Sequence, residues 1–135
     1  MTPRVLAIDH VVLRVSDMAR AIRFYGEVLG CLVERRVDDL GLVQLRAGAA
    51  LIDLVDVAGS LGRAGGAAPG REARNMDHLA LRLEAFDEAA LRAHLAAHGV
   101  AAGEVAMRYG AEGEGSSLYI RDPDGNVIEL KAPQV

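Results

Sequence analysis

The feature that most constrains this chain is an internal repeat. The heptapeptide DHVVLRV at residues 9–15 recurs as DHLALRL at residues 77–83, with four identical positions and three apolar replacements. A second match, ALIDLV at 50–55 and NVIELK at 126–131, places a carboxylate between an isoleucine and a leucine both times. Because the two matches fall in the same order at nearly the same offset, we expect two copies of one supersecondary unit.

The same order of secondary-structure elements is expected in each copy. Residues 10–15 alternate between apolar and polar side chains, which is typical of a half-buried strand. Asp17 can cap the following helix, whose apolar side chains at three- and four-residue spacing end at Gly30. In the second copy we expect a strand at residues 76–83 and a helix at 86–98. The other strands are expected at residues 32–37, 42–46, 51–57, 100–107, 117–121 and 127–131, so each module is predicted to be β-α-β-β-β, with a DPDG hairpin turn at 122–125.

The repeat also predicts the domain organisation. Module one covers about residues 5–57 and module two about residues 76–132, while residues 58–75 are rich in glycine, alanine and arginine and suit a linker or mobile loop. A module of about 60 residues buries too little surface to be stable by itself. We therefore expect a single α+β domain over residues 1–135, in which the two modules share a core.

Four side chains at matching positions carry the chemistry of the chain. His10 and His78 stand in the first strand of each module, and Asp53 and Glu129 stand in the last. Their apolar strand neighbours pack inward, so these four side chains are expected on the opposite face. A lone histidine or carboxylate on a strand is usually structural or solvated, but four at matching positions favour a shared role. Paired across a pseudo-two-fold axis, they suit a divalent ion such as zinc, nickel, manganese or iron.

The aspartate of this set differs from its counterpart. Asp53 is one methylene shorter than Glu129, which costs it about 1.5 Å of reach. It can coordinate the ion directly, bind it through a water molecule, or not bind it. In the last case two histidines and one carboxylate remain, a set that suits iron(II) chemistry.

Further polar side chains share the strand faces of the candidate ligands. The arginines among them would favour an anionic or polar substrate. The alternative is a solvated sheet face, since the chain has a single lysine and uses arginine for most of its positive charge. The candidate substrate-binding residues are Arg14, Gln44, Arg46, Arg82, Tyr119 and Arg121.

Composition excludes several classes of protein. The formal net charge is -4 and no run of lysine or arginine occurs, so we expect no nucleic-acid partner. One cysteine cannot form an internal disulfide, which favours a reducing, cytoplasmic location. No segment approaches the roughly 18 apolar residues of a transmembrane helix, so no membrane partner is expected. A small molecule remains as the expected partner.

Four motifs together resemble the vicinal oxygen chelate superfamily, which groups glyoxalase I, extradiol dioxygenases, and fosfomycin- and bleomycin-resistance proteins. They are DHVVLRV at 9–15, FYGEVLG at 24–30, DHLA at 77–80 and DPDGNVIEL at 122–130. The resemblance covers nearly the whole chain. It implies paired βαβββ modules whose curled mixed sheets form a cup around a divalent metal, and a homodimer in which each site is often shared between chains.

The resemblance also implies the reaction class. Glyoxalase I places its metal ligands at positions matching His10, Asp53, His78 and Glu129, normally with Glu where this chain has Asp53. It further implies that Glu129 or Asp53 shuttles a proton while the metal chelates two adjacent substrate oxygens. We therefore expect a metal-dependent lyase or isomerase of the glyoxalase I type. The alternatives are an extradiol-type dioxygenase, which needs only His10, His78 and Glu129, and a metal-free protein that sequesters a drug-like ligand.

Overall fold

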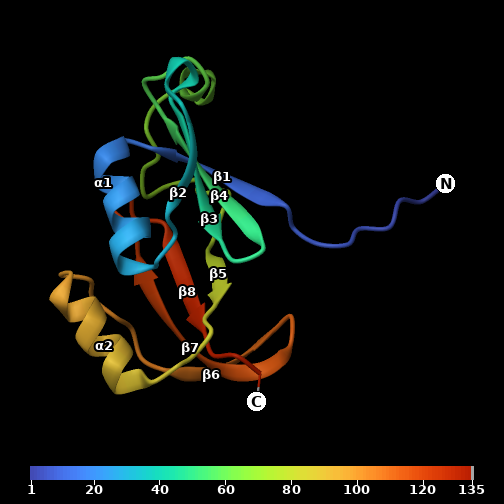
Figure 1. Cartoon of the computed structure of the whole chain (residues 1–135), viewed down its shortest axis with the longest axis vertical. Coiled ribbons are helices and arrows are strands. Elements are labelled where there is room, and N and C mark those ends of the chain that lie inside the picture. Colours follow the sequence, from blue (N-terminus) through green and yellow to red (C-terminus); the bar gives the residue numbers. More distant parts are fainter. Residues whose placement is uncertain (135) are drawn as a thin grey trace. The chain divides into compact units, whose positions relative to one another are not determined.

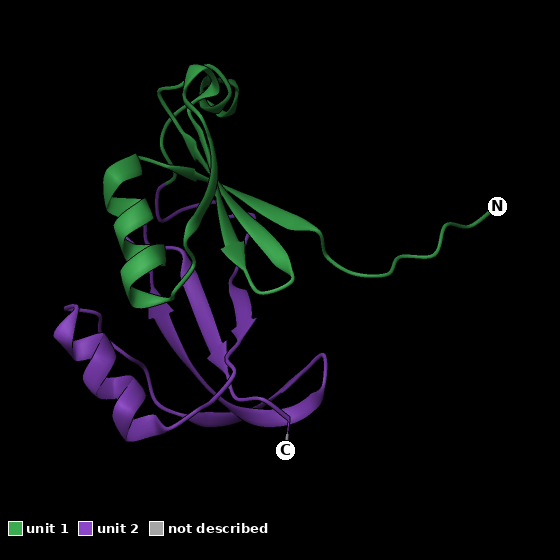
Figure 2. Ribbon diagram, in the orientation of Figure 1, with its two compact units in different colours: residues 1–69 green, residues 70–135 purple. Residues whose placement is uncertain are grey.

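The computed structural model describes residues 1–134, which form two compact units. Unit 1 covers Met1–Pro69, and unit 2 begins at Gly70 (Figure 2). The boundary falls inside the segment 58–75 that the sequence marks as a connection. Each unit contains one copy of the repeat.

Unit 1 has the predicted β-α-β-β-β order (Figure 1). Its four strands form one mixed sheet in the order β1-β4-β3-β2, in which β1 runs parallel to β4 and the other pairs are antiparallel. Asp17 caps α1 as expected, because its side chain accepts a hydrogen bond from the backbone N–H of Arg20 at 3.0 Å. The elements are β1 (His10–Val15), α1 (Met18–Arg23), β2 (Val33–Val37), β3 (Leu42–Ala47) and β4 (Ala50–Asp56).

Unit 2 repeats this arrangement. Its strands follow the order β5-β8-β7-β6, again with one parallel pair, β5 with β8. Asp87 caps α2 through the N–H of Ala90 at 3.0 Å. The elements are β5 (Leu79–Arg82), α2 (Glu88–Ala97), β6 (Ala106–Gly110), β7 (Gly113–Arg121) and β8 (Val127–Lys131). The predicted α+β fold of two βαβββ modules, each with a four-stranded mixed sheet, is therefore confirmed.

The core of each unit follows the period-two alternation of its strands. In β4, Ile52 and Leu54 are fully buried, and in β8 the equivalent Ile128 and Leu130 are fully buried as well. Helix α2 adds Leu95, which is also inaccessible to solvent. The buried isoleucines and leucines of β4 and β8 occupy one face of each sheet. The residues between them, which include the candidate ligands, therefore lie on the other face.

The first helix differs from the expected single amphipathic helix. The α-helix ends at Arg23 and continues as a π-helical segment, Phe24–Val28. Phe24 and Tyr25 are both buried, with their rings edge to face at a centroid distance of 5.1 Å. A π-helical segment inserts one extra residue into the turn. Both aromatic side chains of this segment therefore belong to the core of unit 1.

Three predicted strands have clearly different bounds in the structure, and one of them, expected at 117–121, is the longer β7, Gly113–Arg121. The strand expected at 100–107 is β6, Ala106–Gly110, and the one expected at 76–83 is shorter, Leu79–Arg82. Residues 100–105 lie outside the ladder, although the N–H of Gly103 bonds to the carbonyl of Tyr119 at 2.9 Å. Strand β6 instead forms a tight hairpin with β7 through Gly113, whose φ of 97° requires glycine.

The connecting segment is more ordered than its composition predicts. Gly62–Gly65 forms a short 3-10 helix.

No helix within residues 1–134 has the length and apolar composition needed to span a bilayer.

Candidate metal-binding site

The first histidine–carboxylate pair lies at the parallel junction of β1 and β4 in unit 1. The Nε2 of His10 is 4.0 Å from Oδ2 of Asp53, and the Nδ1 of the same ring bonds to the Asp9 carboxylate at 2.6 Å. Asp53 is only 4% exposed. Gln44 on β3, opposite Asp53 in the sheet, donates from Nε2 to Oδ2 at 3.1 Å.

The second pair lies at the equivalent junction of β5 and β8 in unit 2. The Nε2 of His78 is 3.1 Å from Oε1 of Glu129, and its Nδ1 bonds to the Asp77 carboxylate at 2.7 Å. Glu129 is 5% exposed. Tyr119 occupies the position opposite Glu129 that Gln44 has in unit 1, and its ring meets the His78 ring edge-on at 5.4 Å.

Each pair leaves one buried oxygen without a hydrogen bond. Within residues 1–134 the buried side-chain polar atoms that lack a partner are Oδ1 of Asp53 and Oε2 of Glu129. An unsatisfied buried polar atom costs about 1–3 kcal/mol, and more when it is charged. The two oxygens stand at repeat-equivalent positions, and a bound divalent cation would satisfy an oxygen of this kind.

Each histidine ring lies between two carboxylates. In each, Nδ1 contacts the carboxylate of the preceding aspartate and Nε2 faces the buried carboxylate of the last strand. Metal-binding histidines usually donate their second N–H to a carboxylate in this way. Each pair supplies one imidazole and one carboxylate, and residues 1–134 contain no group of three or more His, Cys, Asp or Glu side chains placed to hold a metal ion.

The Asp9 contact also changes the titration of its histidine. The hydrogen bond to Asp9 is the largest effect that raises the pKa of His10 above its ordinary value of 6.5, and the charge of Asp53 raises it further. Partial desolvation opposes both effects. A metal ion bound at Nε2 therefore competes with a proton that the two carboxylates stabilise.

Three of the four candidate substrate-binding arginines bind partners within their own units. Arg14 donates to the backbone carbonyls of residues 62, 66 and 67 in the connecting segment. Arg46 forms a two-pronged ion pair with Glu34, at 2.9 and 2.8 Å, and the pKa of that carboxyl is lowered by it. Arg82, the repeat equivalent of Arg14, lies 3.2 Å from Glu112.

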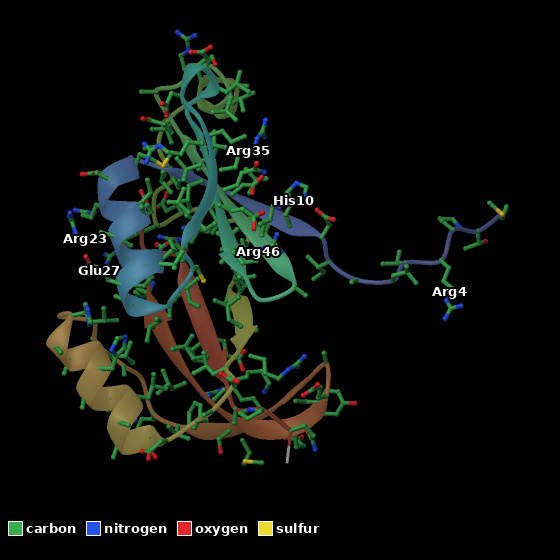
Figure 3. All side chains as sticks on the ribbon, in the orientation of Figure 1. Arg4, His10, Arg23, Glu27, Arg35 and Arg46 are labelled. Carbon is green, nitrogen blue, oxygen red and sulfur yellow. The ribbon has the colours of Figure 1, made fainter. Side chains whose placement is uncertain are left out.

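The other candidates lie near the carboxylates or the hairpin turn. Gln44 links Asp53 to Arg35, which donates to Oε1 of Gln44 at 3.1 Å. Figure 3 shows Arg35, His10 and Arg46 on the side of the unit 1 sheet away from helix α1. Arg121 reaches the carbonyl of Gly125 at 3.4 Å, within the predicted turn.

The sequence pattern missed two basic residues of unit 2, one beside Glu129 and one beside Tyr119. Lys131 is 7% exposed, with Nζ 3.7 Å from Oε2 of Glu129. Arg108 lies over the Tyr119 ring at 4.5 Å and donates to the backbone and hydroxyl oxygens of Ser117. Lys131 could have been noticed because it follows a candidate ligand by two residues, which places it on the same strand face.

This chain is similar in sequence to known proteins. The family described as the Glyoxalase/Bleomycin resistance protein/Dioxygenase superfamily matches residues 7–130. Virulence protein STM3117 of Salmonella typhimurium is 36% identical over 125 residues, which cover 91% of this chain and 81% of that protein.

Solved structures show the same fold over nearly the whole chain. The crystal structure of STM3117 has a TM-score of 0.74 at 30% identity, covering 98% of this chain and 100% of the other. A lactoylglutathione lyase from Agrobacterium tumefaciens has a TM-score of 0.65 at 25% identity, covering 93% and 92%. An integron cassette protein from the V. cholerae mobile metagenome reaches 0.76 at 26% identity, covering 99% and 100%.

Proposed function

The chain belongs to the Glyoxalase/Bleomycin resistance protein/Dioxygenase superfamily, and on this premise we propose that it is a metal-dependent lyase or isomerase of the glyoxalase I type. Its substrate would be a small molecule with two adjacent oxygen atoms. The metal would be zinc, nickel, manganese or iron, held by His10, His78 and Glu129, with Asp53 as a fourth ligand.

One observation carries the proposal. The two buried carboxylates occupy equivalent positions of the repeat, each faces a histidine Nε2, and each has one oxygen without a hydrogen bond. A protein that only sequesters a ligand does not need two such costly carboxylates. A divalent ion would satisfy both of them.

When bound, the ion would act as a Lewis acid on the two substrate oxygens. The protein side chains have separate tasks. Asp9 and Asp77 orient the imidazoles, while Gln44 holds one oxygen of Asp53. Glu129 or Asp53 would accept a proton from substrate carbon and return it to the neighbouring carbon, which is general acid–base catalysis.

Substrate selection would involve side chains on the same sheet faces. Tyr119 and Gln44 lie closest to the carboxylates in sheet register. The arginines would act on a polar substrate only after leaving their present partners, which the ion pairs of Arg46 and Arg82 oppose. The cost is modest, because exposed ion pairs are weakened by solvent.

The geometry also supports a second candidate, an extradiol-type dioxygenase. Asp53 is 4.0 Å from its histidine, whereas Glu129 is 3.1 Å from its own. If the shorter side chain does not coordinate, His10, His78 and Glu129 form the two-histidine, one-carboxylate set of iron(II) oxygenases. An Asp53→Ala variant separates these alternatives, since metal affinity falls only if Asp53 is a ligand.

The test is metal binding followed by turnover. We expect the protein, purified without a chelating tag, to bind about one divalent ion per chain, measured by elemental analysis after reconstitution. His10→Ala and Glu129→Gln should each weaken binding by about 10–100-fold or more. His94→Ala, which removes a histidine from α2, is the matched control and should bind like the wild type.

Turnover then assigns the reaction. Conversion of a glutathione hemithioacetal with nickel or zinc would support the lyase, whereas oxygen consumption on catechols with iron would support the dioxygenase. Absence of stoichiometric metal after reconstitution would exclude both and leave the ligand-sequestering protein. We also propose a homodimer, which light scattering of the same preparations would test.

A further inference from the structure

The single lysine of the chain is buried beside a candidate metal ligand. The side chains of Lys131 and Glu129 are 9% and 6% exposed, and Nζ lies 3.7 Å from Oε2 of the carboxylate. This distance is too long for a hydrogen bond, so Oε2 remains unsatisfied. The ammonium group therefore faces the same oxygen atom that is left available for a metal ion.

The surroundings of Lys131 hold the side chain in this position. Its Nζ donates to the backbone carbonyl of Arg108 on β6 at 2.8 Å, so the side chain reaches past the intervening strand β7. Gly110 leaves the space for the lysine stem, since a Cβ at that position would lie 2.7 Å from Cε and 3.2 Å from Cδ. The lysine thus has a dedicated place in unit 2.

Comparison of the two repeats shows that Lys131 has no charged counterpart in unit 1. Lys131 pairs with Arg82 and Ser117 in the sheet, and the position with the equivalent pairing in unit 1 is Val55. Val55 is buried and apolar, and Asp53 receives a hydrogen bond from the neutral amide of Gln44 instead. The two carboxylates therefore differ in charge environment.

We propose that Lys131 is a positioning residue that serves as counter-ion of Glu129 in the metal-free protein and competes with the metal ion for that carboxylate. The inference rests on the proposed function, because it takes Glu129 as a metal ligand. It goes further because it assigns two opposite effects to Lys131. The side chain stabilises the metal-free protein and lowers the affinity for the metal ion.

The physical argument is electrostatic. A buried carboxylate that loses its counter-ion is strongly destabilised, so removing the ammonium weakens the metal-free protein. A metal ion would then neutralise an otherwise uncompensated charge, and it would no longer be repelled by a neighbouring cation. Both effects favour metal binding.

The experiment compares Lys131→Met, which keeps the unbranched stem, with the wild type. We expect the variant to melt at a lower temperature in EDTA and to bind zinc on the order of tenfold more tightly in competition with a chromogenic chelator. Arg92→Met is the matched control, because it removes one positive charge from α2, where Arg92 pairs with Glu88 at 3.0 Å. This control should leave zinc affinity unchanged.

Unchanged or weaker zinc binding by Lys131→Met would overturn the inference, since a merely structural lysine changes stability without increasing affinity. A wild type that binds none of zinc, nickel, manganese and iron would instead refute the proposed function. The counter-ion role is then tested in EDTA alone. The destabilisation by Lys131→Met should largely disappear in the Glu129→Gln background, and its persistence there would refute the role.

If Lys131→Met does not fold, the double variant Glu129→Gln, Lys131→Met tests the counter-ion role instead. It removes both charges, which is often neutral or stabilising for a buried pair. We expect the double variant to fold, and its failure to fold would contradict the counter-ion role.

Discussion

At the scale of single residues, each candidate metal-binding histidine is preceded by an aspartate that fixes its orientation. The Asp–His dipeptide occurs in both modules, and both aspartates bond to the Nδ1 of the next residue. The aspartates themselves are almost fully exposed, with 91% and 97% of the side-chain surface accessible. Their position is therefore not explained by packing.

Replacing Asp9 by Asn should lower the pKa of His10. The Asp9 hydrogen bond is the largest contribution that raises this pKa in the folded protein. A raised pKa stabilises the fold fully below the unfolded value and loses that contribution as the pH rises through the folded value. In the metal-free protein, Asp9→Asn should therefore cost more stability below about pH 6 than at pH 8.

Proton NMR titration of the histidine rings measures this effect directly. His78 keeps its own aspartate and serves as the internal control in the same spectra. A midpoint for His10 that does not move in Asp9→Asn would contradict the assigned cause.

At the scale of secondary-structure elements, equivalent arginines on β1 and β5 hold local loops. Arg14 anchors residues 62–67, and Arg82 pairs with Glu112 in the β6–β7 hairpin. In unit 1, Gly65 leaves room for this side chain, since a Cβ there would lie 2.4 Å from Nε of Arg14. Gly62 and Gly65 therefore allow close approach.

Substituting Gly62 tests this interpretation. A Cβ there would lie 1.8 Å from the carbonyl oxygen of Asp56, so the backbone must move to accept alanine. We expect Gly62→Ala to lower the free energy of unfolding by about 1–3 kcal/mol, measured by urea denaturation. Gly70→Ala is the control, because a Cβ there meets nothing within 4 Å and the change should stay within about 0.5 kcal/mol. Equal stability of the two variants would contradict an ordered 62–67 segment.

At the scale of the whole molecule, the question is whether two compact units behave as one domain. Each unit has about 65–70 residues, a size at which a single core is only marginally stable. We therefore retain the prediction of one domain with a shared core.

Unfolding should then be a single cooperative transition. In scanning calorimetry the calorimetric and van't Hoff enthalpies of the metal-free protein should agree, as expected for two-state behaviour. Two resolved transitions, or a van't Hoff enthalpy near half the calorimetric value, would show that the units unfold separately.

The sequence predicted the parts of the molecule that depend on local periodicity. Alternation along the strands placed Asp53 and Glu129 between buried isoleucines and leucines, and the structure has the same alternation. The π-helical segment was not predicted, because the three- and four-residue apolar spacing of this segment indicates a regular α-helix. The displaced strand β6 was not predicted either, because its pairing begins at the Gly110–Gly113 hairpin.

The sequence by itself determined the repeat, the two βαβββ modules and the four candidate ligands, since identical local patterns impose identical local structure. Only the tertiary structure decided how the charges around those ligands are distributed. Arg14 meets residues about 50 positions away, and Lys131 meets a carbonyl 23 positions away. Such contacts depend on strand order and register, which bring distant positions together and which no local pattern encodes.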